Sequence, residues 1–428
     1  MTIPLRARHV DLANLVVAKG SNFVLTALLF ALLARGMDSH EFGEFGYWWS
    51  MALMIGGILL GGISSALIRV AAVHGSLRQL LVPLRQAGMA VVVVVVVVVA
   101  VAAFIGPVGG ALAALLAAVA LFGISVQAQT VVLSLLRAVE ATRANLSASL
   151  AIVALVPLAV HVILGDERGL TWAFGALATA FAIGTAAALA LARGRIGRLF
   201  AQLGQAPPGL AGFLGNASAF TAVNVFTYAI VNVDFTLFRQ IGSPADFAAM
   251  ATAKVFFERF VLPALLVFAS AVSLRVLRYP HGASGPAARL HAALTPSLAA
   301  GALITVAALA LGYAFFASTI RGDVHTIGLG WAACASAGYL LFAINGILFD
   351  VLVVRRRLVA VVLHVVAFLG LGCAVQALAI ARLGVPGWAG GWLLFNGVVL
   401  AVLAQEGLEL RLPGRSGGPC ADKPVEDR

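Results

Sequence analysis

Arg35-Gly36-Met37-Asp38-Ser39-His40-Glu41-Phe42-Gly43-Glu44-Phe45-Gly46 is a short polar turn between two long apolar runs, residues 12–34 and 47–67. An apolar run of about 20 residues is long enough to cross a bilayer as a helix. A weaker version of the same layout returns in the second half of the chain, where residues 239–247 form another polar turn before an apolar run. Two related halves with polar residues in their leading helices are typical of a transporter.

The composition predicts an integral membrane protein. Hydrophobic residues make up 62% of the 428 residues and charged residues only 11%, whereas about a quarter of an average soluble domain is charged. The apolar runs are continuous and lack the alternation of a membrane barrel, so they predict an all-α protein. The three cysteines fit no metal site and no disulfide framework. We therefore expect no metal and no cofactor.

Hydropathy predicts about twelve transmembrane helices. They are residues 12–34, 47–67, 87–105, 112–134, 148–163, 171–192, 214–238, 247–274, 294–317, 328–350, 359–381 and 387–406. The longest polar connection, residues 193–212, divides them into two sets of six. We expect one six-helix bundle over residues 1–200, a second over residues 201–410, and a disordered cytoplasmic tail over residues 411–428. An even number of helices in each half predicts parallel repeats.

The loop charges predict the orientation. The five internal loops on one side hold fourteen Lys/Arg and one acid, and the six loops opposite hold five Lys/Arg and seven acids. Arginine and lysine gather on the cytoplasmic side, so both termini are expected in the cytoplasm and the protein in the inner, cytoplasmic membrane. The net charge of +11 then reflects orientation and contact with anionic membrane lipids, and we expect no nucleic-acid partner.

Polar residues at membrane depth are costly, and they usually face a bundle interior or a wet cavity. The candidates are Lys19, Asn22, Asn224, Tyr228, Asp234, Lys254, Glu258 and Arg259. Lys254 and Glu258 are one helical turn apart, which predicts an ion pair. Structural roles stay open: each asparagine can hold two helices together, the Lys254–Glu258 pair can be purely structural, and Lys19 can reach the inner surface. Gly57-x-x-x-Gly61 is interpreted as a helix-packing face.

The chain resembles the polysaccharide flippases of the multidrug/oligosaccharidyl-lipid/polysaccharide (MOP) exporter superfamily. The resemblance covers residues 11–405. It rests on Leu32-Leu33-Ala34-Arg35-Gly36, Glu41-Phe42-Gly43, the segment 62–69, Asp234 and the aromatic, charged span that runs through Pro263. The second half departs from the pattern, because Asp246-Phe247-Ala248 lacks the glycine that is common at that place.

The resemblance implies two six-helix bundles in a V, with a central cavity bordered by spans 12–34 and 214–238. It implies a transporter, not an enzyme, that moves a lipid-linked oligosaccharide, usually on undecaprenyl pyrophosphate, to the outer leaflet. In such a cavity, cations would hold the pyrophosphate, and amides and hydroxyls would bind the sugars. The candidate cations are Lys19, Lys254 and Arg259; the candidate hydrogen-bonding groups are Asn22, Asn224 and Tyr228. Asp234 and Glu258 are the candidates for a coupling ion.

Two other functions remain open. A drug or metabolite antiporter of the same superfamily would share the architecture, but an organic cation favours exposed carboxylates over lysines. A membrane glycosyltransferase or O-antigen polymerase usually has a sizeable outer loop, and here the predicted outer loops are short. For a flippase, the expected partners are its lipid-linked substrate, membrane lipids, and the polysaccharide polymerase and glycosyltransferases of the same pathway.

Overall fold

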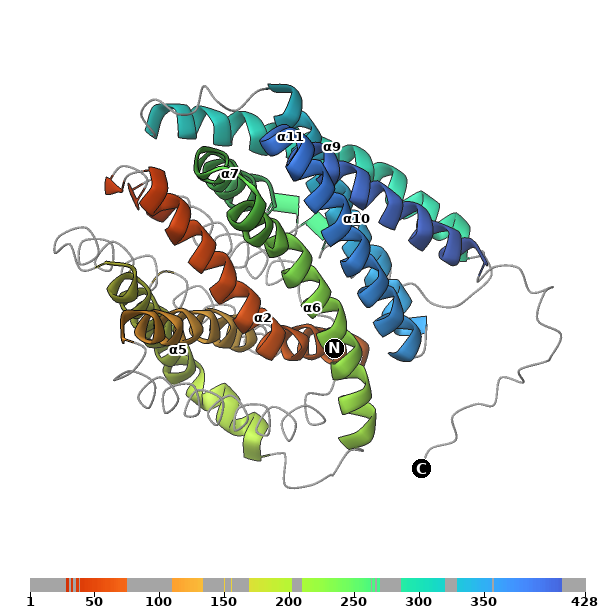
Figure 1. The fold of residues 1–428 in the computed structure, drawn as a ribbon. Helices are drawn as coiled ribbons and strands as arrows, with labels where there is room; N and C mark the ends of the chain where they lie inside the picture. The colour runs from red at the N-terminus through yellow and green to blue at the C-terminus, as the bar shows by residue number, and fades with distance from the viewer. Residues whose placement is uncertain are drawn as a thin grey trace.

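Every regular element that the structure describes is a helix (Figure 1). The structure is a computed structural model. It describes residues 28–30, 32–33, 36–37, 39–74, 110–133, 150, 155, 169–201, 210–262, 264–265, 268–269, 286–319, 329–355 and 358–409. Most of the predicted span 12–34, the span 87–105 and nearly all of the span 148–163 lie outside these residues.

The helices follow the predicted spans. They are α2 (Ser39–His74), the helix Gly110–Leu133, α5 (Gly169–Ala201), α6 (Leu210–Ile241), α7 (Pro244–Phe256), the π-helix η3 (Phe257–Val261), α9 (Pro286–Thr319), α10 (Leu329–Arg355) and α11 (Leu358–Glu409). Within the described residues, four helical segments are long and apolar enough to cross a membrane. This arrangement fits a multi-pass membrane protein.

The two predicted spans 359–381 and 387–406 fall within α11. This helix is broken at Gly384, where φ is 61° and ψ is −135°, and Pro386 follows two residues later. Glycine adopts a positive φ without the steric cost that a Cβ imposes, and proline removes a helical hydrogen bond. The break therefore separates α11 into two segments that match the two spans.

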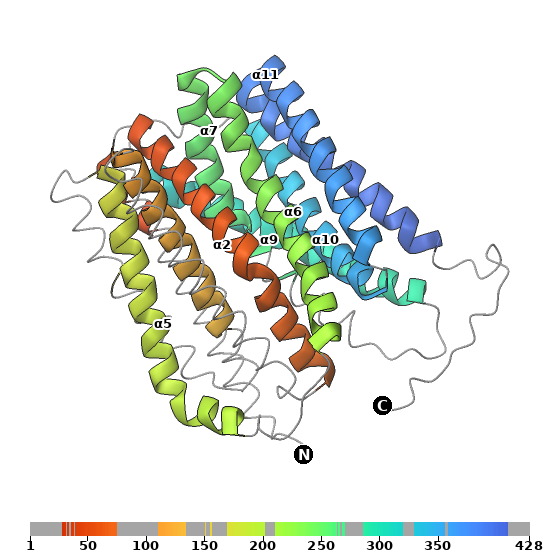
Figure 2. The same cartoon turned by 60° about the horizontal axis from the view of Figure 1, so that its bottom comes forward.

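The described core residues form two clusters, one from each half of the chain. The first is drawn from residues between Leu29 and Ala178, and the second from residues between Val223 and Leu403. Helix α2 of the first half packs against α6 and α7 of the second, and α2 and α6 run side by side in both views (Figure 2). The contact between α2 and α6 is called the seam below.

Glycines let the helices meet closely at the seam. A Cβ on Gly57 would lie 2.2 Å from the ring of Tyr228, and a Cβ on Gly61 would lie 3.3 Å from Asn224. The predicted packing role of Gly57-x-x-x-Gly61 is confirmed, because both glycines face α6. Within the first half, Gly123 packs its backbone directly on α2: a Cβ there would lie 1.9 Å from the carbonyl oxygen of Ala52.

Candidate functional site

The turn between α6 and α7 sets the relative position of these two helices. Ser243 caps α7: its Oγ accepts a hydrogen bond from the backbone N–H of Asp246 at 3.1 Å and donates one to the Asp246 carboxylate at 2.7 Å. Pro244 occupies the first turn, where its missing N–H costs nothing. The capped turn sends α7 back along α6, so that Lys254 of α7 comes opposite Asp234 of α6.

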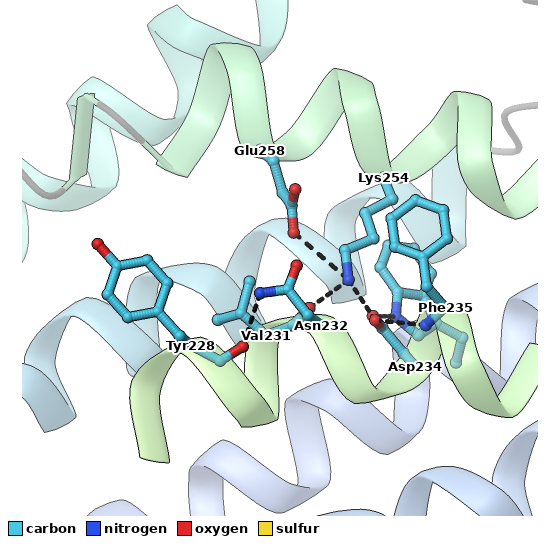
Figure 3. Close-up of polar contacts among 8 residues, drawn as sticks. Tyr228, Val231, Asn232, Asp234, Phe235, Lys254 and Glu258 are labelled. Carbon is cyan, nitrogen blue, oxygen red and sulfur yellow. Dashed lines mark hydrogen bonds and ion pairs between the residues drawn. The ribbon is translucent and has the colours of Figure 1, made fainter. Parts of the chain in front are cut away.

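Lys254, Asp234 and Glu258 form a buried charge cluster (Figure 3). The Lys254 ammonium donates to the carboxylate of Asp234 and to the backbone carbonyl of Val231, and it lies 3.4 Å from Glu258 Oε1. The predicted pairing of Lys254 with Glu258 is therefore confirmed. Trp388 of α11 donates its indole N–H to the second oxygen of Asp234 at 2.7 Å, so the cluster joins three helices.

The cluster is enclosed within the protein. Lys254 is 0% exposed, Asp234 2% and Glu258 7%. The Lys254 ammonium donates hydrogen bonds to two protein acceptors and forms an ion pair with a third group, the Glu258 carboxylate. In this conformation the ammonium is thus engaged by the protein itself, and a substrate phosphate could bind it only by displacing one of these acceptors.

Two buried acids depend on the Lys254 ammonium. Two carboxylates face one ammonium, and the Asp234 carboxylate also accepts the backbone N–H of Phe235 at 2.8 Å. Burying an ion costs several kcal/mol unless a partner and hydrogen bonds offset the loss of water. Removing Lys254 would therefore leave two buried acids without their shared cation.

Aromatic rings surround the cluster. The Lys254 ammonium lies 4.5 Å from the centroid of the Phe235 ring, an arrangement in which the ring quadrupole attracts the cation.

Glu258 lies in the π-helix η3, where Leu262 donates its N–H to the carbonyl of Phe257. Such π-helical turns are rare and are often found at functional sites. Phe257 stacks on Tyr339 of α10 with ring centroids 5.9 Å apart.

A second group of polar side chains lies at the seam. Tyr228 accepts a hydrogen bond at its hydroxyl from the Gln127 amide at 2.7 Å, which connects α6 to the helix Gly110–Leu133 of the first half. Gln127 is 3% exposed, and its Oε1 has no hydrogen-bond partner among the described residues. Asn224 faces Gly61 of α2, and Asn232 donates back to the Tyr228 carbonyl at 2.6 Å.

The structure thus separates the predicted site residues into two places. Asn224 and Tyr228 lie at the seam, and Asp234, Lys254 and Glu258 lie in the charge cluster. Lys19 and Asn22 lie outside the described residues, as does the side chain of Arg259, whose backbone belongs to η3.

Trp388 was not predicted from the sequence as a site residue, and Gln127 was only a weaker candidate. The Trp388–Asp234 bond joins helices far apart in the chain, and no local pattern indicates it. Gln127 carried a signal, because it is an amide inside an apolar run. Its partner could not be read from that signal.

Comparisons with known proteins identify the fold. No family model matches the chain, and no curated protein matches it. The chain is similar to a solved outward-facing conformation of a multidrug resistance MATE family transporter of the MOP superfamily, with 14% identity and a TM-score of 0.60 over 94% of each chain. It is similar to a MATE in complex with MaD3S, with 15% identity and a TM-score of 0.60 over 94% of this chain and 95% of that one.

An inward-facing conformation of a multidrug resistance MATE family transporter is also similar, with 12% identity and a TM-score of 0.52 over 94% of this chain and 98% of that one. The likeness spans nearly the whole chain in each case. The protein therefore has the fold of MATE transporters of the MOP superfamily.

Proposed function

We propose that this protein is a membrane transporter that flips a lipid-linked oligosaccharide, carried on a polyprenyl pyrophosphate, across the cytoplasmic membrane. The observation that carries the proposal is the fold, which matches transporters over 94% of the chain. The sequence motifs around residues 32–43 and 62–69 resemble those of polysaccharide flippases within the same superfamily. In this proposal the protein moves its substrate and leaves it chemically unchanged.

The groups at the seam suit a sugar. A sugar offers hydroxyls that donate and accept hydrogen bonds, and an amide or a phenol can do both in return. Tyr228, Gln127 and Asn224 supply these groups where the first half meets the second. When the halves separate, we expect these side chains to exchange their contacts with each other for contacts with the sugar.

A drug or metabolite antiporter is the second candidate, because the similar solved structures include multidrug resistance transporters. A cavity for an organic cation requires accessible carboxylates. Among the side chains that the structure describes, two acids lie in the middle of predicted spans, Asp234 and Glu258. Both contact Lys254. Because Lys254 already engages both acids, they are less available to an organic cation, which favours the flippase over the cation antiporter.

The charge cluster is our proposed place for coupling to a cation gradient. The Lys254 ammonium contacts both carboxylates, so a proton or a monovalent cation that binds one of them would change its attraction to the ammonium. Asp234 and Glu258 are the two candidate acceptors. Because the cluster joins α6, α7 and α11, a change in its charge would act on three helices of the second half at once.

Deleting the gene is expected to stop the delivery of one surface or exported polysaccharide. Without the protein, the hydrated sugars and phosphates would have to cross roughly 30 Å of hydrocarbon unaided, so the lipid-linked precursor should build up on the cytoplasmic face. Extraction and mass spectrometry of the precursor, with and without the gene, measure this. A plasmid copy of the gene is the control and should restore delivery. Normal polysaccharide together with increased sensitivity to organic cations would instead favour the antiporter.

A further inference from the structure

The beginning of α2 and the end of α6 are joined by a charged contact between the two halves. Arg239, in the last turn of α6, forms an ion pair with Glu44 of α2 at 3.3 Å. The Arg239 guanidinium also lies 4.5 Å from the ring centroid of Tyr47 and 5.7 Å from that of Trp48. One arginine of the second half is therefore held by three side chains of the first.

An apolar contact lies beside this ion pair. Gly43 of α2 faces Phe247 of α7 so closely that a Cβ on Gly43 would lie 3.2 Å from the ring. Phe247 in turn packs edge-on against Phe235 of α6, with ring centroids 6.3 Å apart. Phe235 is the ring beside the Lys254 ammonium. The contact between the halves is thus continuous with the charge cluster.

We propose that Arg239, Glu44, Tyr47 and Trp48 form a latch that holds the two halves together at this end and opens when they separate there. The inference rests on the proposed transport function, in which the halves part at each end in turn. Both turns that flank the latch, residues 35–46 and 239–247, are predicted on the outer side of the membrane. The latch therefore closes the outer end of the seam.

The chemistry of the latch suits repeated opening. The side chains of Arg239 and Glu44 are 41% and 18% exposed, so water can replace each partner as the contact breaks. Ion pairs and cation–π contacts at such partly exposed positions are weak. The Lys254–Asp234 pair differs in this respect, because it is buried and cannot separate without leaving charges unsolvated. We therefore expect the contacts of the latch to break and re-form, and the ion pair of the charge cluster to stay intact.

The latch can be tested by measuring the distance across it. Spin labels at His40 on α2 and Ala245 on α7, both exposed, report the separation of the halves in lipid vesicles. A second pair at Gln240 and Ala381 lies within the second half and is the control. The labels require a background without Cys334, Cys373 and Cys420.

Replacing Arg239 by glutamine is expected to raise the ratio of open to closed molecules by about tenfold, since it removes both the ion pair and the cation–π contacts. Arg239→Lys keeps the charge but loses the planar group, so it should have a smaller effect. The double variant Glu44→Arg with Arg239→Glu should restore part of the closed population. The control pair should report one unchanged distance in every variant.

An unchanged distance distribution across the latch in Arg239→Gln, with the control pair also unchanged, would overturn the proposal. A change in the control pair would also overturn it, because the arginine would then stabilise the second half itself. The measurement needs no substrate. A failure of the latch is therefore distinguishable from a failure of the proposed flippase function, which leaves these distances unaffected.

Discussion

Replacing Lys254 by methionine is expected to destabilise the protein by about 3–5 kcal/mol, the usual cost of removing one partner from a buried ion pair. The substitution keeps most of the length of the side chain but leaves Asp234 and Glu258 buried without the ammonium that they share. Less folded protein should accumulate in the membrane. The purified variant should unfold at a lower temperature or denaturant concentration than the original protein.

Two companion variants separate charge from packing. The triple variant Lys254→Met, Asp234→Asn, Glu258→Gln removes every charge of the cluster and should recover much of the lost stability. Arg382→Met removes an exposed cation from α11 and should leave stability unchanged. If Lys254→Met alone were as stable as the original protein, the ion cluster would not hold α6 and α7 together.

The second large effect is expected from Gly57→Ala at the seam. An alanine Cβ would lie 2.2 Å from the Tyr228 ring, so α2 and α6 would have to move apart or the ring would have to leave its bond to Gln127. Overpacking of this kind costs about 1–3 kcal/mol. Transport and stability should both fall, although alanine is by itself the better helix former by about 1 kcal/mol.

Gly175→Ala in α5 is the matched control, because nothing lies within 4 Å of a Cβ at that position. It should be neutral or slightly stabilising in the same assays. Combining Gly57→Ala with Tyr228→Leu should relieve the clash and recover stability. Equal behaviour of Gly57→Ala and Gly175→Ala would show that the two helices do not meet as closely as the structure places them.

The sequence was sufficient to predict the helices that the structure describes and some of their local contacts. Continuous apolar runs marked the spans, the spacing of Lys254 and Glu258 indicated their pairing, and Gly57-x-x-x-Gly61 marked the packing face of α2. Each of these signals depends only on the geometry of one helix. For that reason they could be read before the arrangement of the helices was known.

The partners in contacts between helices could not be predicted from the sequence. Asp234 and Lys254 are each polar residues in an apolar span, but their pairing depends on the direction in which α7 leaves its turn. Trp388 reaches Asp234 only because α11 packs on α6. Arg239 and Glu44 belong to different halves, and the turns in which they lie were predicted only to share one side of the membrane.

The π-helix at Glu258 had no signal that could be read from the sequence. Its residues, Phe257-Glu258-Arg259-Phe260-Val261, include no residue type that distinguishes a π-helical turn from an α-helical one. In a π-helical turn each hydrogen bond spans one residue more than in an α-helix. The side chains after the turn therefore point in other directions than they would in a continuous α-helix. Periodicity arguments for this span therefore lose register after Glu258.

The proposed flippase moves a lipid-linked oligosaccharide across the membrane and does not alter it. The most direct measurement places purified protein in vesicles whose inner leaflet carries the labelled substrate, and then adds an impermeant glycosidase outside. We expect the substrate to become accessible to the enzyme, its mass before digestion to be unchanged, and protein-free vesicles to retain it. A substrate that emerged longer, cleaved or transferred to another acceptor, or that stayed inaccessible, would show that the protein is not a flippase of this substrate.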